Sequence, residues 1–129
     1  MISDRPLDGR RVLLVEDNQL FSSALKLLFE DEGLVLVQTC TNMKAALAAA
    51  RTEEVDVALL DVNIGGENVF PVAEVLEKRR VPYIFLTGYG GNSLPPSFRN
   101  RPAFSKTSAP KAVLEAIAAT CHPPDALIQ

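Results

Sequence analysis

Short runs of apolar residues alternate along the chain with segments in which apolar residues recur every three to four positions. The runs predict strands that are buried on both faces, and the segments with helical spacing predict amphipathic helices. The predicted strands cover residues 11–15, 34–39, 55–60, 83–86 and 103–105. The predicted helices cover residues 20–29, 42–52 and 69–80, and a last helix follows residue 108. This alternation implies a parallel sheet with helices on both sides.

Capping residues support several of these boundaries. Asp17 or Asn18 precedes the first predicted helix and Gly33 follows it, as expected for an N-cap and a C-cap. Ser108 is the predicted cap of the last helix, with Pro110 in its first turn. Between residues 88 and 102, glycines and prolines leave room for about one helical turn. A connection of this length is typical of a functional or mobile segment.

Five parallel strands of a doubly wound α/β fold suit the order 2-1-3-4-5, here with a short or irregular fourth helix. Binding sites in such sheets lie beyond the carboxyl ends of the strands. Polar residues stand at these ends: Glu16 and Asp17 after the first strand, Asp61 after the third, Thr87 after the fourth and Lys106 after the fifth. We therefore expect these side chains to meet at one edge of the sheet.

Three carboxylates in one pocket repel one another, by roughly 3 kcal/mol for each pair at about 5 Å and an effective dielectric near 20. Lys106 supplies one positive charge, and a divalent cation would bring the sum to zero. Oxygen ligands of this kind favour Mg²⁺. Asp17 and Asp61 would bind it directly, and Glu16 would act through water or position a ligand. The backbone carbonyl of Asn63 could join them.

A carboxylate beside Mg²⁺ and an ammonium group can act as a nucleophile toward a phosphoryl group. The metal and Lys106 would balance the charge on the equatorial phosphoryl oxygens, and the Thr87 hydroxyl could donate to one of them. This chemistry makes Asp61 the predicted acceptor in an aspartyl phosphate.

With these residues in place, the chain resembles the receiver domain of bacterial two-component response regulators, which has a flavodoxin-like fold. The matching segments are VLLVEDN (12–18), VALLDVNIGGE (57–67), FLTGYG (85–90) and FSK (104–106). The resemblance covers residues 10–120, and we expect one receiver domain in residues 1–129 without an output domain. It implies a signalling phosphoprotein rather than an enzyme. A histidine kinase would phosphorylate Asp61, and Asn63 and Gly65 would tune the lifetime of the phosphate.

The stretch PYIFLTGYG (82–90), with the broken fourth helix, resembles the stand-alone "FAT GUY" subgroup of receivers. This resemblance implies a kinase of the HWE type and output through contacts with a downstream protein. Two positions depart from the receiver pattern. Thr107 follows the lysine where receivers usually carry proline, and Ala103 stands where they usually carry an aromatic switch residue. Tyr89 is the candidate replacement for that switch.

Composition disfavours several other classes of protein. The chain has 13 Lys and Arg against 16 Asp and Glu, so its net charge of −3 argues against binding to nucleic acid or to an anionic membrane. Two cysteines without metal-site spacing, Cys40 and Cys121, fit a reducing compartment. No secretion signal or membrane-length apolar run is seen, so we expect a cytoplasmic protein.

Three alternative functions share parts of this pattern. A receiver-like adaptor that needs no phosphate, or a phosphate sink or relay, would keep the fold, and the departures at Ala103 and Thr107 keep this alternative open. A phosphatase of the haloacid-dehalogenase type needs Asp-x-Asp after its first strand, whereas Asp61-Val62-Asn63 follows the third strand. A flavin protein needs a phosphate-binding loop where the acidic pair 16–17 stands.

Overall fold

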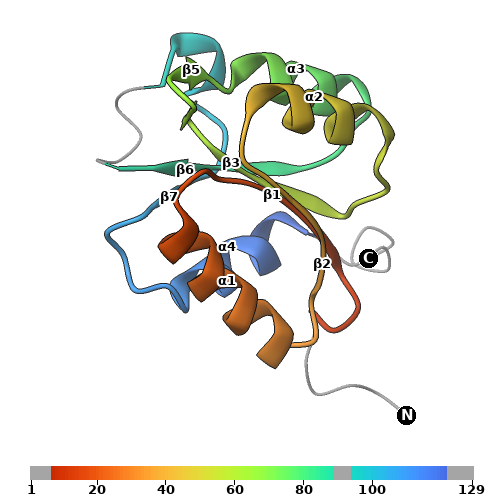
Figure 1. Ribbon diagram of the computed structural model, residues 1–129, viewed down its shortest axis with the longest axis vertical. Helices are drawn as coiled ribbons and strands as arrows, with labels where there is room; N and C mark the ends of the chain where they lie inside the picture. Colours follow the sequence, from red (N-terminus) through yellow and green to blue (C-terminus); the bar gives the residue numbers. More distant parts are fainter. Residues whose placement is uncertain (1–6, 89–93, 122–129) are drawn as a thin grey trace.

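The computed structural model describes residues 7–88 and 94–121 and has a five-stranded parallel sheet at its centre (Figure 1). The strands lie in the order β2-β1-β3-β6-β7. Their bounds are β1 Arg11–Val15, β2 Val35–Cys40, β3 Val57–Asp61, β6 Tyr83–Thr87 and β7 Ala103–Ser105. These are the predicted strands in the predicted order, so the flavodoxin-like α/β fold is confirmed.

Helices cover both faces of the sheet, as the alternating pattern predicts. Helices α2 (Met43–Thr52) and α3 (Phe70–Lys78) lie on one face, and α1 (Gln19–Asp31) and α4 (Ala112–Thr120) lie on the other (Figure 1). Successive residues of β1 point to opposite sides, so that Leu13 packs with α2 and α3 while Leu14 packs with α1 and α4. The interior strands β1, β3 and β6 are therefore buried on both faces, whereas the edge strand β2 is partly exposed.

Side-chain caps fix the starts of the first two helices. Asn18 is the N-cap of α1, and its Oδ1 accepts a hydrogen bond from the amide of Phe21 at 3.1 Å. Asn42 caps α2 in the same way, through the amide of Ala45 at 2.8 Å. Asn18 rather than Asp17 is thus the cap, which leaves the Asp17 carboxylate available to the strand end.

The predicted start of the last helix is wrong. Helix α4 begins at Ala112, its N-cap is Lys111, and no side chain caps it, so Ser108 does not have the expected role. The amide of Ala112 instead donates to the carbonyl of Ala109 at 2.9 Å, in a turn that precedes the helix. Proline disfavours helical backbone in the residue before it, which explains why Pro110 delays the helix rather than beginning it.

A small hairpin follows β3, at residues for which the sequence pattern predicts neither a strand nor a helix. Strands β4 (Asn63–Ile64) and β5 (Glu67–Asn68) pair antiparallel through a two-residue turn. The turn consists of Gly65 and Gly66, with φ values of +60° and +84°. Tight hairpin turns of this type need positive φ at both central residues, so glycine suits both positions.

The connection between β6 and β7 contains little helix in the part that the structure describes. Its one described helical element is the 3₁₀ turn η2 (Pro96–Phe98), which confirms the prediction of a short fourth helix for these residues. An aromatic cluster holds this turn against α3 and β6. In the cluster, the ring of Phe98 stacks on Phe70 at 5.1 Å and meets Phe85 edge-on at 5.6 Å, and Tyr83 meets Phe85 at 5.3 Å.

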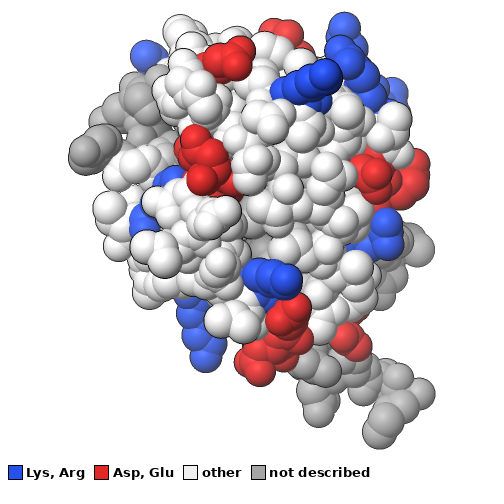
Figure 2. All heavy atoms as spheres, viewed as in Figure 1, with Lys and Arg blue, Asp and Glu red and all other residues white. Residues whose placement is uncertain are grey.

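In the part of the chain that is described, no helix has both the length and the apolar character needed to cross a membrane. The face of the molecule shown in Figure 2 carries both basic and acidic side chains, and several basic ones lie together at the upper right of the view.

Candidate functional site

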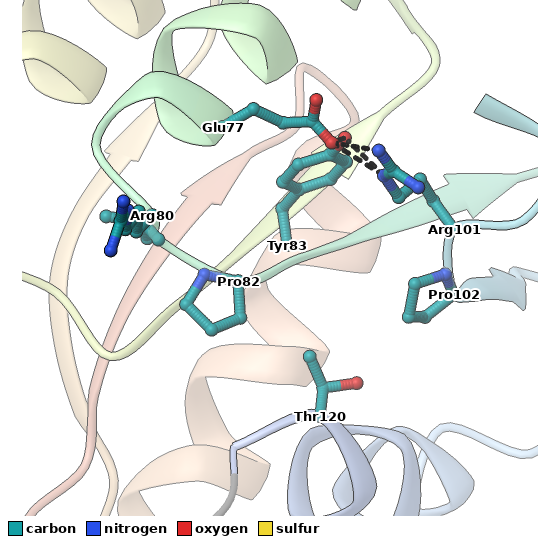
Figure 3. A pocket seen from close by; sticks show the side chains of 8 residues that line it. Glu77, Arg80, Pro82, Tyr83, Arg101, Pro102 and Thr120 are labelled. Atoms are coloured by element: carbon teal, nitrogen blue, oxygen red, sulfur yellow. Dashed lines mark hydrogen bonds and ion pairs between the residues drawn. The ribbon is translucent and has the colours of Figure 1, made fainter. Parts of the chain in front are cut away.

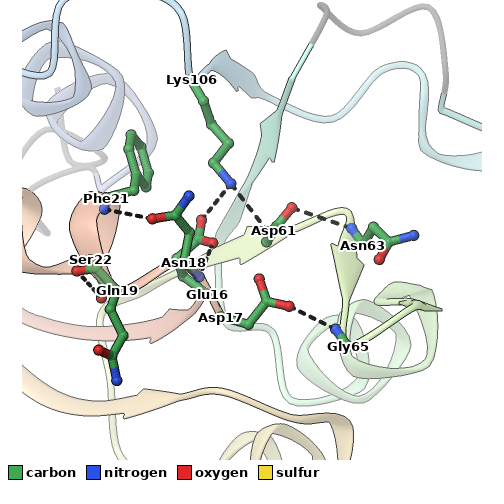
Figure 4. Close-up of polar contacts among 10 residues, drawn as sticks. All are labelled: Glu16, Asp17, Asn18, Gln19, Phe21, Ser22, Asp61, Asn63, Gly65 and Lys106. Atoms are coloured by element: carbon green, nitrogen blue, oxygen red, sulfur yellow. Dashed lines mark hydrogen bonds and ion pairs between the residues drawn. The ribbon is translucent and has the colours of Figure 1, made fainter.

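The carboxyl ends of β1 and β3 bring three acidic side chains together (Figure 4). Carboxylate oxygens of Glu16, Asp17 and Asp61 all lie within 4.8 Å of one another. Glu16 is fully buried and Asp61 is 9% exposed, whereas Asp17 is exposed. The side chains that the sequence predicts to meet at this edge of the sheet are therefore adjacent, and we call them the acidic cluster.

Lys106 reaches this acidic cluster from the end of β7. Its Nζ lies 2.8 Å from Oε1 of Glu16 and 3.3 Å from Oδ2 of Asp61. The ring of Phe21, on α1, lies beneath the ammonium group with its centroid 5.1 Å from Nζ. An aromatic face attracts a cation, so Phe21 adds to the groups that hold the lysine in place. The apolar spacing of the first helix predicts a buried face that includes Phe21, but it does not predict this contact.

Thr87 is held next to Lys106 by the sheet itself. It is the last residue of β6, it is 2% exposed, and it pairs with Ser105 of β7. Its carbonyl accepts a hydrogen bond of 2.7 Å from the amide of Lys106. The predicted threonine and lysine are thus tied to each other through the backbone at neighbouring strand ends.

The ionisation of the pocket reflects burial and mutual charge. Burial raises the pKa of Glu16, and the hydrogen bonds from Lys106 and from the amide of Asn18 only partly oppose this. Burial works in the opposite direction on the ammonium group, but the pKa of Lys106 is nevertheless raised, because Glu16 and Asp61 together outweigh the burial. The lysine is consequently held in its charged form beside the two carboxylates.

Backbone amides fix the orientation of each carboxylate. The amide of Asn18 donates to Glu16 at 2.8 Å, that of Asn63 to Asp61 at 3.3 Å, and that of Gly65 to Asp17 at 3.0 Å. The last of these bonds joins the β4–β5 hairpin to the end of β1. The side chain of Asn63 faces the hairpin, where it accepts a bond of 3.1 Å from Gly66. The sequence gives no signal for the bond between Gly65 and Asp17, because it depends on how the hairpin folds back toward β1.

The donor set fits a divalent cation. The acidic cluster with Lys106 carries a formal charge of −2, and its oxygen ligands are the hard donors that Mg²⁺ prefers. The amide bonds turn the Asp17 and Asp61 carboxylates toward a common region without using all of their oxygen atoms. That Asn63 contributes its backbone carbonyl stays a prediction.

The two departures from the receiver pattern occupy different environments. Ala103 is exposed at the start of β7. Thr107 lies in the loop after Lys106, and its Oγ1 is 2.7 Å from Oγ of Ser105, which also accepts a bond from the amide of Thr107 at 3.3 Å. Lys106 reaches the acidic cluster with threonine in this position. The switch candidate Tyr89 lies outside the described residues.

Comparison with known proteins agrees with this geometry. The model of the response regulator receiver domain family matches residues 12–100. A response regulatory protein of Yersinia pestis is 32% identical over 81 residues, which cover 61% of this chain and 34% of that protein. The chain spans only 23 to 34% of the length of the curated relatives it matches.

Solved structures give the same picture. The solution structure of SdrG from Sphingomonas melonis Fr1 superposes with a TM-score of 0.76 at 36% identity, covering 87% of this chain and 96% of that one. The BeF₃-activated conformation of SdrG, from Pseudomonas melonis Fr1, superposes with a TM-score of 0.74 at 34% identity and the same coverage.

Proposed function

The chain belongs to the response regulator receiver domain family, and on that premise we propose that it is a phosphorylation-dependent signalling module whose phosphoacceptor is Asp61. The observation that carries the proposal is the position of Lys106, which contacts Asp61 and Glu16 beside the exposed carboxylate of Asp17. The phosphodonor would be the phosphohistidine of a sensor kinase. The similarity to SdrG, which has a BeF₃-activated conformation, supports this type of regulation.

In the proposed reaction, an oxygen of the Asp61 carboxylate forms a bond to phosphorus while the bond between phosphorus and the kinase imidazole breaks. The imidazole leaves with the electron pair and takes up a proton. Lys106, which already contacts Asp61 at 3.3 Å, would balance charge on the phosphoryl oxygens, and the Thr87 hydroxyl would donate to one of them. Hydrolysis of the aspartyl phosphate returns the resting carboxylate.

Asp17 and Asp61, with Glu16 behind them and the carbonyl of Asn63, would hold Mg²⁺. When bound, the ion supplies two positive charges that offset both the acidic cluster and the incoming phosphoryl group. Asn63 and Gly65, which lie two and four positions after Asp61, would set the lifetime of the aspartyl phosphate. Gly65 lies next to the acidic cluster, because its amide donates to the Asp17 carboxylate at 3.0 Å.

Phosphate would shift the protein toward its signalling state through contacts that only this state makes, chiefly with Thr87 and Lys106. Because β6 and β7 carry these residues, the connection between them is the element we expect to respond, with Tyr89 as the proposed switch residue. The output would be a contact with a downstream protein. The PYIFLTGYG stretch and the short η2 turn favour the FAT GUY subgroup, and hence a kinase of the HWE type. Two buried free thiols fit a cytoplasmic location.

The test is incubation with acetyl phosphate, with and without Mg²⁺, followed by intact mass and hydroxylamine treatment. Wild type should gain one hydroxylamine-sensitive phosphoryl group only when Mg²⁺ is present. Asp61→Asn should gain none. Asp56→Asn, which changes an aspartate just before the same strand, is the matched control and should behave like wild type. Equal labelling of the Asp61 variant would refute the assignment.

The departures at Ala103 and Thr107 favour one alternative, a receiver-like adaptor that works without phosphate. It predicts that wild type stays unlabelled in the same experiment, whereas a phosphate sink or relay would be labelled and would pass the group on to a second protein. As a signalling module, the protein should show no turnover of small phosphoesters such as p-nitrophenyl phosphate.

A further inference from the structure

A cavity of about 490 Å³ opens at the end of the sheet opposite the acidic cluster (Figure 3). It lies where β6 and β7 begin, whereas the acidic cluster lies where strands end. Its principal lining residues are Arg80, Pro82, Tyr83, Arg101, Pro102 and Thr120. Two proline rings and an aromatic ring give it rigid apolar walls, so the apolar part of a ligand would meet side chains that are already ordered.

The polar groups of the cavity leave an excess of positive charge. The Glu77 carboxylate accepts from the hydroxyl of Tyr83 at 3.0 Å and pairs with Arg101, whose Nη1 takes part in none of these contacts. Arg101 and Glu77 therefore neutralise each other. The guanidinium of Arg80 makes no hydrogen bond or ion pair with any residue in 7–88 or 94–121. Among the residues that the structure describes, Arg80 is thus a cation at the cavity without a counter-charge, in a chain whose net charge is −3.

The backbone at Arg80 is the second, independent observation. Arg80 follows the end of α3 with a φ of +62°, and it is the one non-glycine residue with positive φ in the described part of the chain. Glycine is the usual residue at this position after a helix, and a side chain there costs about 1 kcal/mol. Strained residues of this kind cluster at sites of function. Figure 3 shows Arg80 beside Pro82 and Arg101 beside Pro102, across the gap between the two rings.

We propose that this cavity is a binding site for a small organic carboxylate with an apolar body. The body would lie between the rings of Pro82, Pro102 and Tyr83, and the carboxylate would bind the guanidinium of Arg80. The volume is within the range of about 300–1,000 Å³ that is usual for small-molecule sites. A cationic ligand would be repelled by the positive charge of Arg80. A neutral ligand would form no ion pair with its guanidinium.

This binding site is separate from the proposed phosphoacceptor. Tyr83 and Thr87 are the two ends of β6, and four residue steps of a strand extend roughly 13 Å. A bound carboxylate and a phosphoryl group would therefore not touch each other. The two proposals are independent, and each can fail without the other.

The experiment is a titration of the ¹⁵N-labelled protein with 2-naphthoate, followed through its amide resonances. The neutral 2-naphthamide and the cationic 2-naphthylmethylammonium are probes matched in shape. We expect saturable shifts at Val81, Tyr83 and Arg101 with naphthoate, and binding at least about tenfold weaker with the two other probes, as befits a charge-assisted hydrogen bond. Asp61→Asn should leave the naphthoate affinity unchanged.

Arg80→Gly separates binding from folding. Because glycine relieves the positive φ, this variant should melt at the wild-type temperature or above it, yet bind naphthoate at least about tenfold more weakly. The matched control is Arg51→Ala, which removes an exposed arginine from α2, away from the cavity, and should bind naphthoate like wild type. Alanine is used there because glycine would destabilise the helix. Equal affinity of Arg80→Gly and wild type, equal affinity for the three probes, or shifts that map elsewhere would overturn the proposal.

Discussion

Replacing Asp17 by asparagine should stabilise the protein in the absence of Mg²⁺. The Asp17 carboxylate lies within 4.8 Å of two other carboxylates, and no cation among the described residues pairs with it. Its one hydrogen bond, from the amide of Gly65, can be accepted equally well by an asparagine oxygen. The substitution therefore removes repulsion and keeps the geometry of the hairpin.

The size of this stabilisation follows from the distance between the Asp17 carboxylate and the two neighbouring carboxylates. Two unit charges separated by 4.8 Å repel by roughly 3.5 kcal/mol at an effective dielectric near 20, and by roughly 1 kcal/mol in bulk water. Because Asp17 is exposed, the lower figure applies to each of its two pairs. The free energy of unfolding should therefore rise by about 1–2 kcal/mol. Mg²⁺ should stabilise wild type more than the variant, because the variant has lost a ligand. The difference in the free energy of unfolding between the two proteins should therefore be smaller with Mg²⁺ than without it.

Urea unfolding followed by circular dichroism, with EDTA and with Mg²⁺, measures both effects. The gain in EDTA should fall at about 1 M salt, where the screening length is about 3 Å. Glu74→Gln, which neutralises an exposed carboxylate of α3, is the control and should change the stability by less than about 0.5 kcal/mol. The predicted repulsion at Asp17 would be refuted if Asp17→Asn were no more stable than wild type in EDTA. Its predicted role as a Mg²⁺ ligand would be refuted if Mg²⁺ stabilised the variant as much as it stabilises wild type.

Three further predictions concern the rest of the fold. Phe98→Ala should lower the free energy of unfolding by about 3 kcal/mol, because it leaves a hole in the aromatic cluster; a loss near zero in urea unfolding would contradict this packing. Gly33→Ala should cost more than Gly66→Ala, since both have positive φ but only at Gly33 would a Cβ collide with a neighbouring carboxylate; equal losses in melting temperature would argue against that collision. Burial raises the pKa of Tyr83 to about 12, whereas the unfolded value is near 10. Wild type should therefore lose stability relative to Tyr83→Phe as the pH rises from about 10 to about 12, and parallel curves in a pH series of thermal unfolding would exclude this titration.

Much of the fold could be predicted from the sequence, because each buried strand is a continuous apolar run bounded by polar residues. The same boundaries place the acidic residues and the lysine. Since parallel strands all end at one edge, Glu16, Asp61 and Lys106 had to converge once the strand order was known. The cap of the first helix could be narrowed to Asp17 or Asn18, because capping is local chemistry between residues three positions apart, whereas the helical pattern places Asn42, the cap of α2, inside the helix.

The features that could not be predicted depend on contacts between distant segments or on very short elements. Strands of two residues, such as β4 and β5, show no periodicity. The contact of Phe21 with Lys106 and the bond from Gly65 to Asp17 join residues that are remote in sequence. Ser108 has good capping chemistry but lies two positions before a proline. Pro110 disfavours helical backbone in the residue before it, and this restriction prevails over the capping preference of Ser108.

The strand that directly precedes Lys106, β7, is the shortest of the sheet and lies at its edge, paired with β6 alone. Such a strand frays more readily than the interior ones, so its amides should exchange with deuterium well before those of β3. Each opening of β7 would withdraw the ammonium group from Glu16 and Asp61 while the centre of the sheet stays folded. The charge balance of the pocket is thus coupled to local opening of the edge strand. Groups that bridge the acidic residues and the lysine should make this opening rarer and slow the deuterium exchange of the β7 amides.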